Sequence, residues 1–275
     1  FDGDANHTGS ESSVVTVTVT APVTPDTITI SGTSIIQTGD VDTITATLLA
    51  GSTAISGETL NYEIKHGTTT IDSGSDTTDS NGEIEISYTG TGVGDVDVVV
   101  TYMSLQEIFV LEDLQLYDTL TSDSGHWTIP SGANVSFNSN GMVLGSSSSW
   151  KDIYLDVPIT KPSEIEYEVV SWTGTNSYHL YFFDSTKANR LFQLYKDNSN
   201  HTVLDVYSSY ANYWNGTIPQ GATVKIKVLT DTMELYVNGE LKVSKSYTMT
   251  SPFIIGVVTA SSRTTTYKNL RIKAL

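Results

Sequence analysis

Apolar and polar residues alternate with a period of two along most of the chain. Residues 14–20 read Val-Val-Thr-Val-Thr-Val-Thr, which is typical of a half-buried strand, and a segment with two prolines at residues 21–25 ends it. Between residues 27 and 102, further alternating runs are separated by turn residues. These runs are Thr27 to Ser31, Asp42 to Leu48, Leu60 to Lys65, Thr69 to Ser73, Glu83 to Tyr88 and Val96 to Tyr102.

Beyond Ser104 the predicted strands become longer, and no segment shows a helical period. We therefore predict an all-β protein. About seven short strands in about 80 residues favour an immunoglobulin-like (Ig-like) sandwich for the first part, followed by a larger sandwich. The longer strands are expected at Ile153 to Val157, Glu164 to Trp172, Tyr178 to Asp184, Leu191 to Tyr195, Val203 to Tyr207, Thr223 to Leu229, Met233 to Val237, Phe253 to Thr259 and Tyr267 to Ile272.

One stretch of the first part carries a specific pattern. The segment Thr78 to Tyr88 contains an Asn-Gly turn that leads into an alternating strand, which predicts a hairpin, and a glycine run at residues 90, 92 and 94 follows. This arrangement resembles the bacterial Ig-like repeats of intimin- and invasin-type adhesins, which also occur in adhesin-like surface proteins of methanogenic archaea. The resemblance implies a stalk that projects a tip domain.

Four segments of the second part follow one another in an order that resembles concanavalin A-like and laminin G-like jelly rolls. In that family the Leu-Tyr-Val-Asn-Gly element, here residues 235–239, is a hairpin, and the terminal strand returns beside the opening one. The resemblance implies a lectin-like tip domain. The four segments are Asp118-Thr119-Leu120 with Trp127, residues 224–228, Glu234 to Leu241, and Tyr267 to Ile272.

Charge and aromatic content change near residue 104. Residues 1–104 contain 15 acidic residues and one basic residue, Lys65, whereas 22 of the 26 aromatic residues follow residue 104. Residues 1–8 also resemble the closing segment of an Ig-like repeat. We therefore expect the last strand of a truncated upstream repeat at residues 1–22, an Ig-like stalk at residues 25–103 and the jelly roll at residues 108–275, with the joint at about residues 103–112.

The composition excludes several classes of function. A formal net charge of -17 is incompatible with a nucleic-acid partner, which needs a basic face. The chain lacks an apolar run of the length of a membrane span, so we expect no membrane insertion in this fragment. Zero cysteines remove disulfides, thiolate metal sites and cysteine nucleophiles. The localisation expected from the resemblance is the extracellular cell surface, or a virion.

Three acidic residues on one strand, Glu164, Glu166 and Glu168, loosely resemble the Glu-x-Asp-x-Glu signature of laminarinase-type glycoside hydrolases. Alternation places the three carboxylates on one face, and Glu164 with Glu168 would be the catalytic pair. The middle position departs from the signature, and the other interpretation is a strand whose acids face water. We expect the second interpretation, and hence no catalytic activity and no catalytic residues.

Metal and cofactor signals are weak. The five histidines show no zinc or triad spacing, so no cofactor and no metal ligand is expected. Residues 2–6, Asp-Gly-Asp-Ala-Asn, resemble the start of a calcium loop but lack its later glycine and glutamate, which leaves calcium only as an alternative. An isopeptide bond from Lys65 has little support.

The strongest ligand signal is the segment from Tyr207 to Gly216, which places four aromatic residues and two asparagines in a loop. Sugars stack their C–H faces on aromatic rings and accept hydrogen bonds from amides. A second loop, residues 184–190, offers charged and amide groups, although an ordinary hydrophilic hairpin tip fits it as well. The expected ligand-binding residues are Tyr210, Asn212, Tyr213 and Trp214, with Asp184, Asn189 and Arg190 from the second loop.

These features together predict a cell-surface adhesin in which an Ig-like stalk presents a lectin-like, carbohydrate-binding domain. Its partner would be a glycan or glycoprotein on another cell or surface. Three alternatives remain: a receptor-binding protein of a tailed virus with the same modules, a glycoside hydrolase that uses Glu164 and Glu168, and a structural surface-layer module without a ligand.

Overall fold

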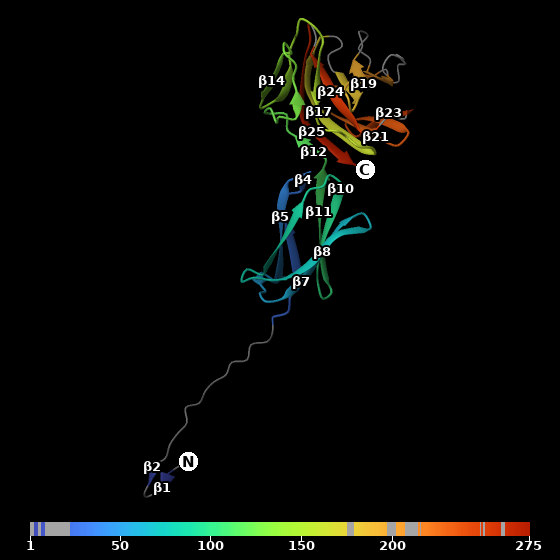
Figure 1. The fold of residues 1–275 in the computed structure, drawn as a ribbon. Helices are drawn as coiled ribbons and strands as arrows, with labels where there is room; N and C mark the ends of the chain where they lie inside the picture. The colour runs from blue at the N-terminus through green and yellow to red at the C-terminus, as the bar shows by residue number, and fades with distance from the viewer. Residues whose placement is uncertain are drawn as a thin grey trace.

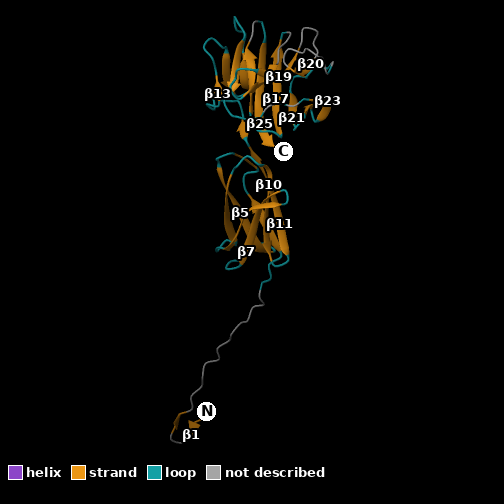
Figure 2. Ribbon diagram, turned by 45° about the vertical axis from the view of Figure 1, so that its right-hand side comes forward, coloured by secondary structure: helices purple, strands orange, loops and turns teal. Residues whose placement is uncertain are grey.

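The structure is a computed structural model that consists of β-strands and loops, with no helix among the residues it describes (Figure 2). The described residues therefore contain no helix that could span a membrane. Two β-sandwiches are stacked end to end, and the C-terminus lies where they meet (Figure 1). The structure describes residues 3–4, 7–8, 23–174, 179–196, 202–206, 214, 216–247, 249, 251–259 and 262–275.

The first sandwich packs a five-stranded sheet, in the order β4-β11-β10-β7-β8, against a sheet in which β5 pairs with β3, β6 and β9. Alternation explains the core, because Ile84, Ile86 and Tyr88 of β9 are buried while Glu85 and Ser87 are exposed. The strands are β3 (Thr27–Ser31), β4 (Ile35–Gln37), β5 (Val41–Ala50), β6 (Thr53–Ala54), β7 (Thr59–His66), β8 (Thr69–Thr77), β9 (Glu83–Thr89), β10 (Gly94–Tyr102) and β11 (Leu105–Leu114).

The Asn81-Gly82 turn does not form the hairpin that the sequence predicts. β8 lies at the edge of the five-stranded sheet, whereas β9 pairs with β5 in the other sheet, so the turn carries the chain from one sheet to the other. The Asp79 carboxylate accepts hydrogen bonds from the backbone N–H groups of Asn81 (2.8 Å) and Glu83 (2.9 Å). This side chain stabilises the turn without strand pairing across it.

The boundary between the sandwiches lies at Gln115 and not at residues 103–112. β11 pairs antiparallel with β10 over its full length, from Tyr102 opposite Leu105 to Gly94 opposite Asp113, and so belongs to the first sandwich. A tight turn at Met103, which has a φ of 50°, joins the two strands. The sequence misleads here because Ile108 and Val110 of β11 point to solvent, so apolar residues do not mark the buried side of this strand.

The second sandwich packs an eight-stranded sheet against a six-stranded one. The first has the order β14-β15-β25-β17-β21-β22-β23, with β12 also paired to β25, and the second has the order β13-β16-β24-β18-β19-β20. The strands are β12 (Leu116–Asp118), β13 (Trp127–Thr128), β14 (Val135–Asn138), β15 (Gly141–Leu144), β16 (Lys151–Leu155), β17 (Ser163–Thr173), β18 (His179–Asp184), β19 (Arg190–Lys196), β20 (Thr202–Val206), β21 (Ala222–Val228), β22 (Thr232–Val237), β23 (Glu240–Ser246), β24 (Phe253–Thr259) and β25 (Thr264–Ala274).

Two details expected from the jelly-roll resemblance are present. β22 and β23 form a hairpin with Val237 opposite Glu240, and Asn238 and Gly239 both have positive φ, which is the backbone of a type I′ turn. The terminal strand β25 pairs with the opening strand β12. The predicted fold class is therefore confirmed as all-β, with a smaller sandwich followed by a larger one that is consistent with a concanavalin A-like jelly roll.

A further short hairpin near the N-terminus pairs β1 (Gly3–Asp4) with β2 (His7–Thr8). The strand expected over residues 14–20, and with it most of the expected upstream repeat, lies outside the described residues.

A single residue, Gln115, separates β11 of the first sandwich from β12 of the second. Hydrogen bonds from Gln115 itself and from the nearby Tyr117 connect the two sandwiches. The Tyr117 N–H donates to Gln37 Oε1 (3.1 Å), and Gln115 Nε2 donates to Thr160 Oγ1 (3.1 Å). The link has no room for a flexible linker.

Ion pairs also connect the two sandwiches. Lys273 Nζ of β25 lies 2.6 Å from the Asp95 carboxylate of β10, and Arg271 lies 3.3 Å from the Glu112 carboxylate of β11. Gly94 permits this approach: its φ is +102°, and a Cβ added to it would lie 2.9 Å from the backbone oxygen of Ala274. The last glycine of the run noted in the sequence thus allows the sandwiches to touch.

Candidate functional site

The structure describes only part of the predicted aromatic loop. Tyr210, Asn212 and Tyr213 lie outside the described residues. Trp214 is half-buried and packs against the main core of the second sandwich, with Lys242 Nζ 5.8 Å from its ring centroid. Its ring also lies against Gly216, because a Cβ added there would approach the ring to 2.0 Å. For Trp214, the structure favours a packing role over a ligand contact.

Two residues predicted in the second loop hold that loop together. The Asp184 carboxylate accepts hydrogen bonds from the hydroxyl of Thr186 (2.7 Å), the backbone N–H of Ala188 (3.0 Å) and the amide of Asn189. These hydrogen bonds, led by those from Thr186 and Asn189, lower the pKa of Asp184. Asp184 and Asn189 therefore position the loop, and their polar groups are already engaged.

The third predicted residue of this loop, Arg190, leads to a different site. Its guanidinium lies 4.4 Å from the ring centroid of Tyr181 and 5.8 Å from that of Phe183. Both rings belong to a second apolar cluster, separate from the main core. We call this cluster the aromatic face; it consists of Tyr154, Tyr181, Phe183, Ile254 and Val258.

Strand alternation shows where the aromatic face lies. In β18, Leu180 and Phe182 belong to the main core, whereas Tyr181 and Phe183 belong to the aromatic face. β16 and β24 alternate in the same way. The aromatic face therefore lies on the outer side of the six-stranded sheet, where all of its members except Tyr154 are buried, at 2–4% exposed. Gly256 of β24 lies beneath it, and a Cβ added there would be 2.9 Å from the Phe183 ring.

Charged side chains surround the aromatic face. Arg190 forms an ion pair with Asp152, and Lys187 pairs with Asp156 while its ammonium lies 5.3 Å from the centroid of the Tyr154 ring. Burial raises the pKa of Asp156, but the hydrogen bonds from Lys187 and Thr128 outweigh it, so the pKa lies below its ordinary value. The face thus combines apolar rings with fixed charges of both signs.

Trp150 and Arg263 extend this surface. Trp150 is 50% exposed and immediately precedes β16. The Arg263 guanidinium lies 4.7 Å from its ring centroid. Burial lowers the pKa of Arg263, and the charge of nearby Tyr181 opposes this shift. An exposed indole therefore lies beside the aromatic face with a cation stacked on it.

Sequence reasoning found Arg190 but missed the rest of this surface. The run Leu180 to Phe183 is apolar at every position, so its period cannot show which rings face the core. Trp150 follows four serines at residues 146–149 and is an isolated aromatic residue in a loop, which is the one signal that could have identified it.

The acidic strand β17 is neutralised by lysines of β21. Lys225 Nζ lies 2.8 Å from Glu164 and 3.2 Å from Glu166, and Lys227 lies 3.7 Å from Glu164. Burial lowers the pKa of Lys225, but the interactions with Glu164 and Glu166 outweigh it and raise the pKa overall. Glu168 accepts a hydrogen bond from Asn269 (3.4 Å). All three carboxylates thus have protein partners.

No group of three or more metal-ligating side chains occurs among the described residues. The possible calcium loop at residues 2–6 falls mostly outside them. Lys65, considered for an isopeptide bond, forms an ion pair with Glu63.

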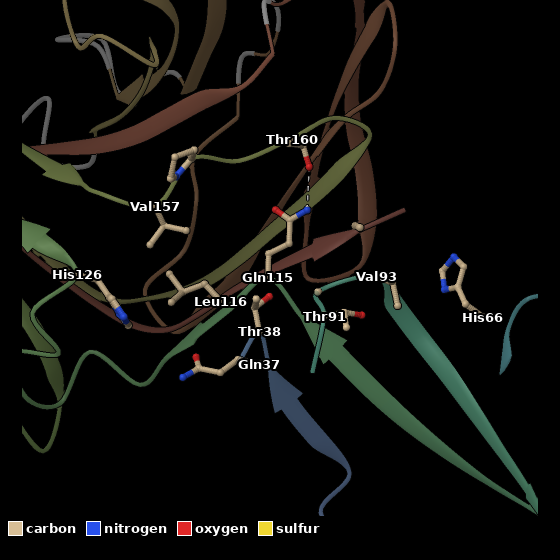
Figure 3. A pocket seen from close by; sticks show the side chains of 13 residues that line it. Gln37, Thr38, His66, Thr91, Val93, Gln115, Leu116, His126, Val157 and Thr160 are labelled. Atoms are coloured by element: carbon tan, nitrogen blue, oxygen red, sulfur yellow. Dashed lines mark hydrogen bonds between the residues drawn. The ribbon is translucent and has the colours of Figure 1, made fainter. Parts of the chain in front are cut away.

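A second concave feature lies at the joint between the sandwiches (Figure 3). This cleft has a volume of about 670 Å³. Figure 3 shows Gln115 and Thr160 hydrogen-bonded in its wall, with His126 and His66 on opposite sides of the view. Its lining residues are Gln37, Thr38, His66, Thr91, Gly92, Val93, Gln115, Leu116, His126, Val157, Pro158, Thr160 and Ala274.

Neither a family model nor a curated protein matches the chain. Solved structures do resemble it. A sialidase shares 14% identity, with a TM-score of 0.47 over 66% of this chain and 21% of its own. A Crh5 transglycosylase in complex with NAG shares 12% identity, with a TM-score of 0.48 over 58% and 83%. The carbohydrate binding module CBM66 from Bacillus subtilis shares 11% identity, with a TM-score of 0.37 over 54% and 95%.

These similarities correct one expectation from the sequence. The acidic strand was interpreted as evidence against catalytic activity, yet the similar structures include two enzymes, the sialidase and the transglycosylase. The exclusion of catalysis is therefore withdrawn. At such low identities the likeness concerns the fold alone.

Proposed function

We propose that the second sandwich recognises a glycan, and that the site is the exposed Trp150 together with Arg190 and Arg263, which lie over the buried aromatic face. The observation that carries the proposal is the exposed Trp150 indole beside a sheet face on which guanidinium groups and aromatic rings meet. Large exposed rings are unusual on a soluble domain and commonly mark a binding surface.

The chemistry of this surface suits a sugar. The half-exposed Trp150 ring can stack on the C–H groups of a pyranose, and Arg263 lies against the indole. Arg190 can donate to sugar hydroxyls and Asp152 can accept from them, in directions that their own ion pair fixes. Asp152 lies on β16 and Arg190 begins β19, so the sheet fixes the positions of this pair before the sugar arrives.

Binding of the full chain to a glycan array tests the proposal. Trp150→Ala should weaken binding more than tenfold with little change in melting temperature, because the ring is half exposed. Leu241→Ala is the matched control, since Leu241 is 48% exposed on the β22–β23 hairpin of the other sheet. Absence of any glycan binding by the wild-type chain, or equal binding by the Trp150 and Leu241 variants, would refute the assignment.

We further propose that the chain belongs to an extracellular adhesin, in which the Ig-like sandwich is a stalk and the jelly roll binds a glycan or glycoprotein on another cell or surface. The end-to-end arrangement supports this, because the aromatic face then lies on the domain that projects furthest from residue 25 (Figure 1). Attachment of glycan-coated beads to cells that display the full chain, compared with the Trp150→Ala variant, tests this role. Beads that attach equally to both would contradict it.

A further inference from the structure

We propose that the cleft at the joint is a second binding site, separate from the aromatic face, and that it takes a small neutral ligand rich in hydroxyl groups, namely a monosaccharide or disaccharide. The cleft differs from the aromatic face in location and in chemistry. It lies between β4 and the loop after β9 on one side and the loops around β12, β13 and β16 on the other.

The size of the cleft fits this class of ligand. Small-molecule sites in proteins commonly measure about 300 to 1,000 Å³, and the cleft measures about 670 Å³. Its walls belong to two domains, which is a frequent location for ligand sites.

The lining is polar and, apart from His66 and His126, consists of side chains that carry no charge. Among the described residues that form it there is no Asp, Glu, Lys or Arg, although the chain carries a net charge of -17. Hydroxyl and amide groups come from Thr38, Thr91, Thr160, Gln37 and Gln115. Groups that both donate and accept hydrogen bonds match sugar hydroxyls, whereas a charged ligand would enter without a counter-charge.

Apolar side chains complete the lining. Leu116, Val93, Val157 and Pro158 give the cleft a surface that the C–H groups of a pyranose can contact. Mixed walls of this kind are typical of sites that hold an amphipathic ligand.

Two polar atoms of the wall need a partner. Gln115 Oε1 and His126 Nδ1 are shielded from solvent and have no hydrogen-bond partner among the described residues. Such atoms are rare in native proteins, because an unpaired buried polar group is unfavourable. A hydroxyl group that enters the cleft and turns either side chain toward itself would supply the missing hydrogen bond.

The walls are fixed before a ligand arrives. The Thr91 and Gly92 backbone N–H groups both donate to the Asp113 carboxylate (2.9 Å each), which is fully buried. The Gln37 side chain is held as well, because its Oε1 accepts a hydrogen bond from the Tyr117 N–H (3.1 Å). Pre-organised walls reduce the entropy lost on binding.

Two-dimensional NMR titration of the ¹⁵N-labelled full chain tests this site. The probes are lactose, cellobiose and N-acetylglucosamine, with glucuronic acid as the charged counterpart. We expect at least one neutral probe to shift the amide signals of residues 91–93 and 115–116. Gln115→Leu should lower its affinity about tenfold, as expected for the loss of one hydrogen bond.

Thr160→Trp should abolish these shifts, because an indole at this exposed position of the rim fills the cleft. Thr69→Trp is the matched control, since Thr69 is exposed on β8 and does not line the cleft. Trp150→Ala should leave the shifts unchanged. This variant separates the two sites: if it alone loses binding, the aromatic face accounts for all sugar recognition and the cleft proposal is wrong.

Three other outcomes of the titration would contradict the cleft proposal. If no neutral probe shifts the cleft signals, the cleft holds solvent only and the proposal fails, while the aromatic face stays testable on the array. Shifts that persist in the Thr160→Trp variant, or that are as large with glucuronic acid, would also overturn it.

Discussion

Asp113 is a fully buried carboxylate of the first sandwich, and its replacement gives a sharp test of the structure. Its carboxylate is fully buried and accepts four hydrogen bonds, from the hydroxyls of Tyr88 (2.7 Å) and Thr91 (3.1 Å) and from the backbone N–H groups of Thr91 and Gly92 (2.9 Å each). The two N–H groups bind different oxygens, Oδ2 and Oδ1 respectively.

This geometry sets the size of the effect. Asp113→Ala leaves two backbone N–H groups and two hydroxyls without an acceptor, and since each unpaired buried N–H costs about 1–3 kcal/mol, we expect a loss of about 3–5 kcal/mol in unfolding free energy. Asp113→Asn keeps the shape but must turn its NH₂ group toward one of the two backbone N–H groups. We therefore expect an intermediate loss of about 1–3 kcal/mol.

Urea unfolding measured with two probes is the assay. All four tryptophans lie in the second sandwich, at residues 127, 150, 172 and 214, so their fluorescence reports that domain alone, whereas circular dichroism reports both. The Asp113 variants should lower the midpoint of the transition seen only by circular dichroism. Asp76→Asn is the matched control: Asp76 is an exposed acid on β8, and it should change stability by less than about 0.5 kcal/mol. Equal effects of Asp113→Asn and Asp76→Asn would refute the reasoning.

Three further predictions concern the joint, alkaline pH and the candidate site. Gly94→Ala should loosen the joint and broaden the distance distribution in small-angle X-ray scattering. Gly39→Ala is the control: Gly39 has a φ of +89° and no atom within 4 Å of an added Cβ, so the substitution should introduce similar backbone strain without broadening the distribution. Burial and then the hydrogen bond to Asp113 raise the pKa of Tyr88 from its ordinary value of 10.0 to about 12. Its contribution to stability is therefore complete below pH 10 and is lost as the pH rises toward 12, and Tyr88→Phe should flatten this decline in a pH series of melting temperatures. Gly256→Ala should displace the Phe183 ring and cost about 1–3 kcal/mol by overpacking, with weaker glycan binding on the array.

The sequence predicted best those strands that bury one face and expose the other to solvent. β3 matches its predicted range, Thr27 to Ser31, and β9 and β22 differ from theirs by one residue at one end. In such strands alternation reports burial directly, because a polar residue at every second position faces water. The short strands β4, β6, β12 and β13 were missed, since two or three residues are too few to establish a period.

The candidate site was harder to predict for a related reason. β18 and β24 carry apolar residues on both faces, so period-two reasoning assigns all of them to one core and leaves no surface for a ligand. Trp214 misled in the opposite direction. A ring in a loop that ends in glycine was expected to have few partners to pack against, but Gly216 has no side chain and leaves room for the indole to turn onto the core. Which way a loop ring turns depends on tertiary packing, and local sequence does not encode it.

The joint shows how two sandwiches can follow one another with a single residue between them. The second sandwich begins three residues after Asp113, whose carboxylate accepts hydrogen bonds within the first sandwich. In the second sandwich the buried Asp118 has the same role: it accepts hydrogen bonds from the Leu120 N–H (2.8 Å), the Ser124 hydroxyl (2.6 Å) and the Trp127 indole (3.1 Å). Asp113 and Asp118 therefore each take their hydrogen bonds from within their own domain. The contacts that cross the joint are instead partly exposed ion pairs and amide hydrogen bonds, which are individually weak. The relative orientation of the sandwiches thus depends on the continuity of β11 with β12 and on the close approach that Gly94 allows, more than on the strength of any single contact.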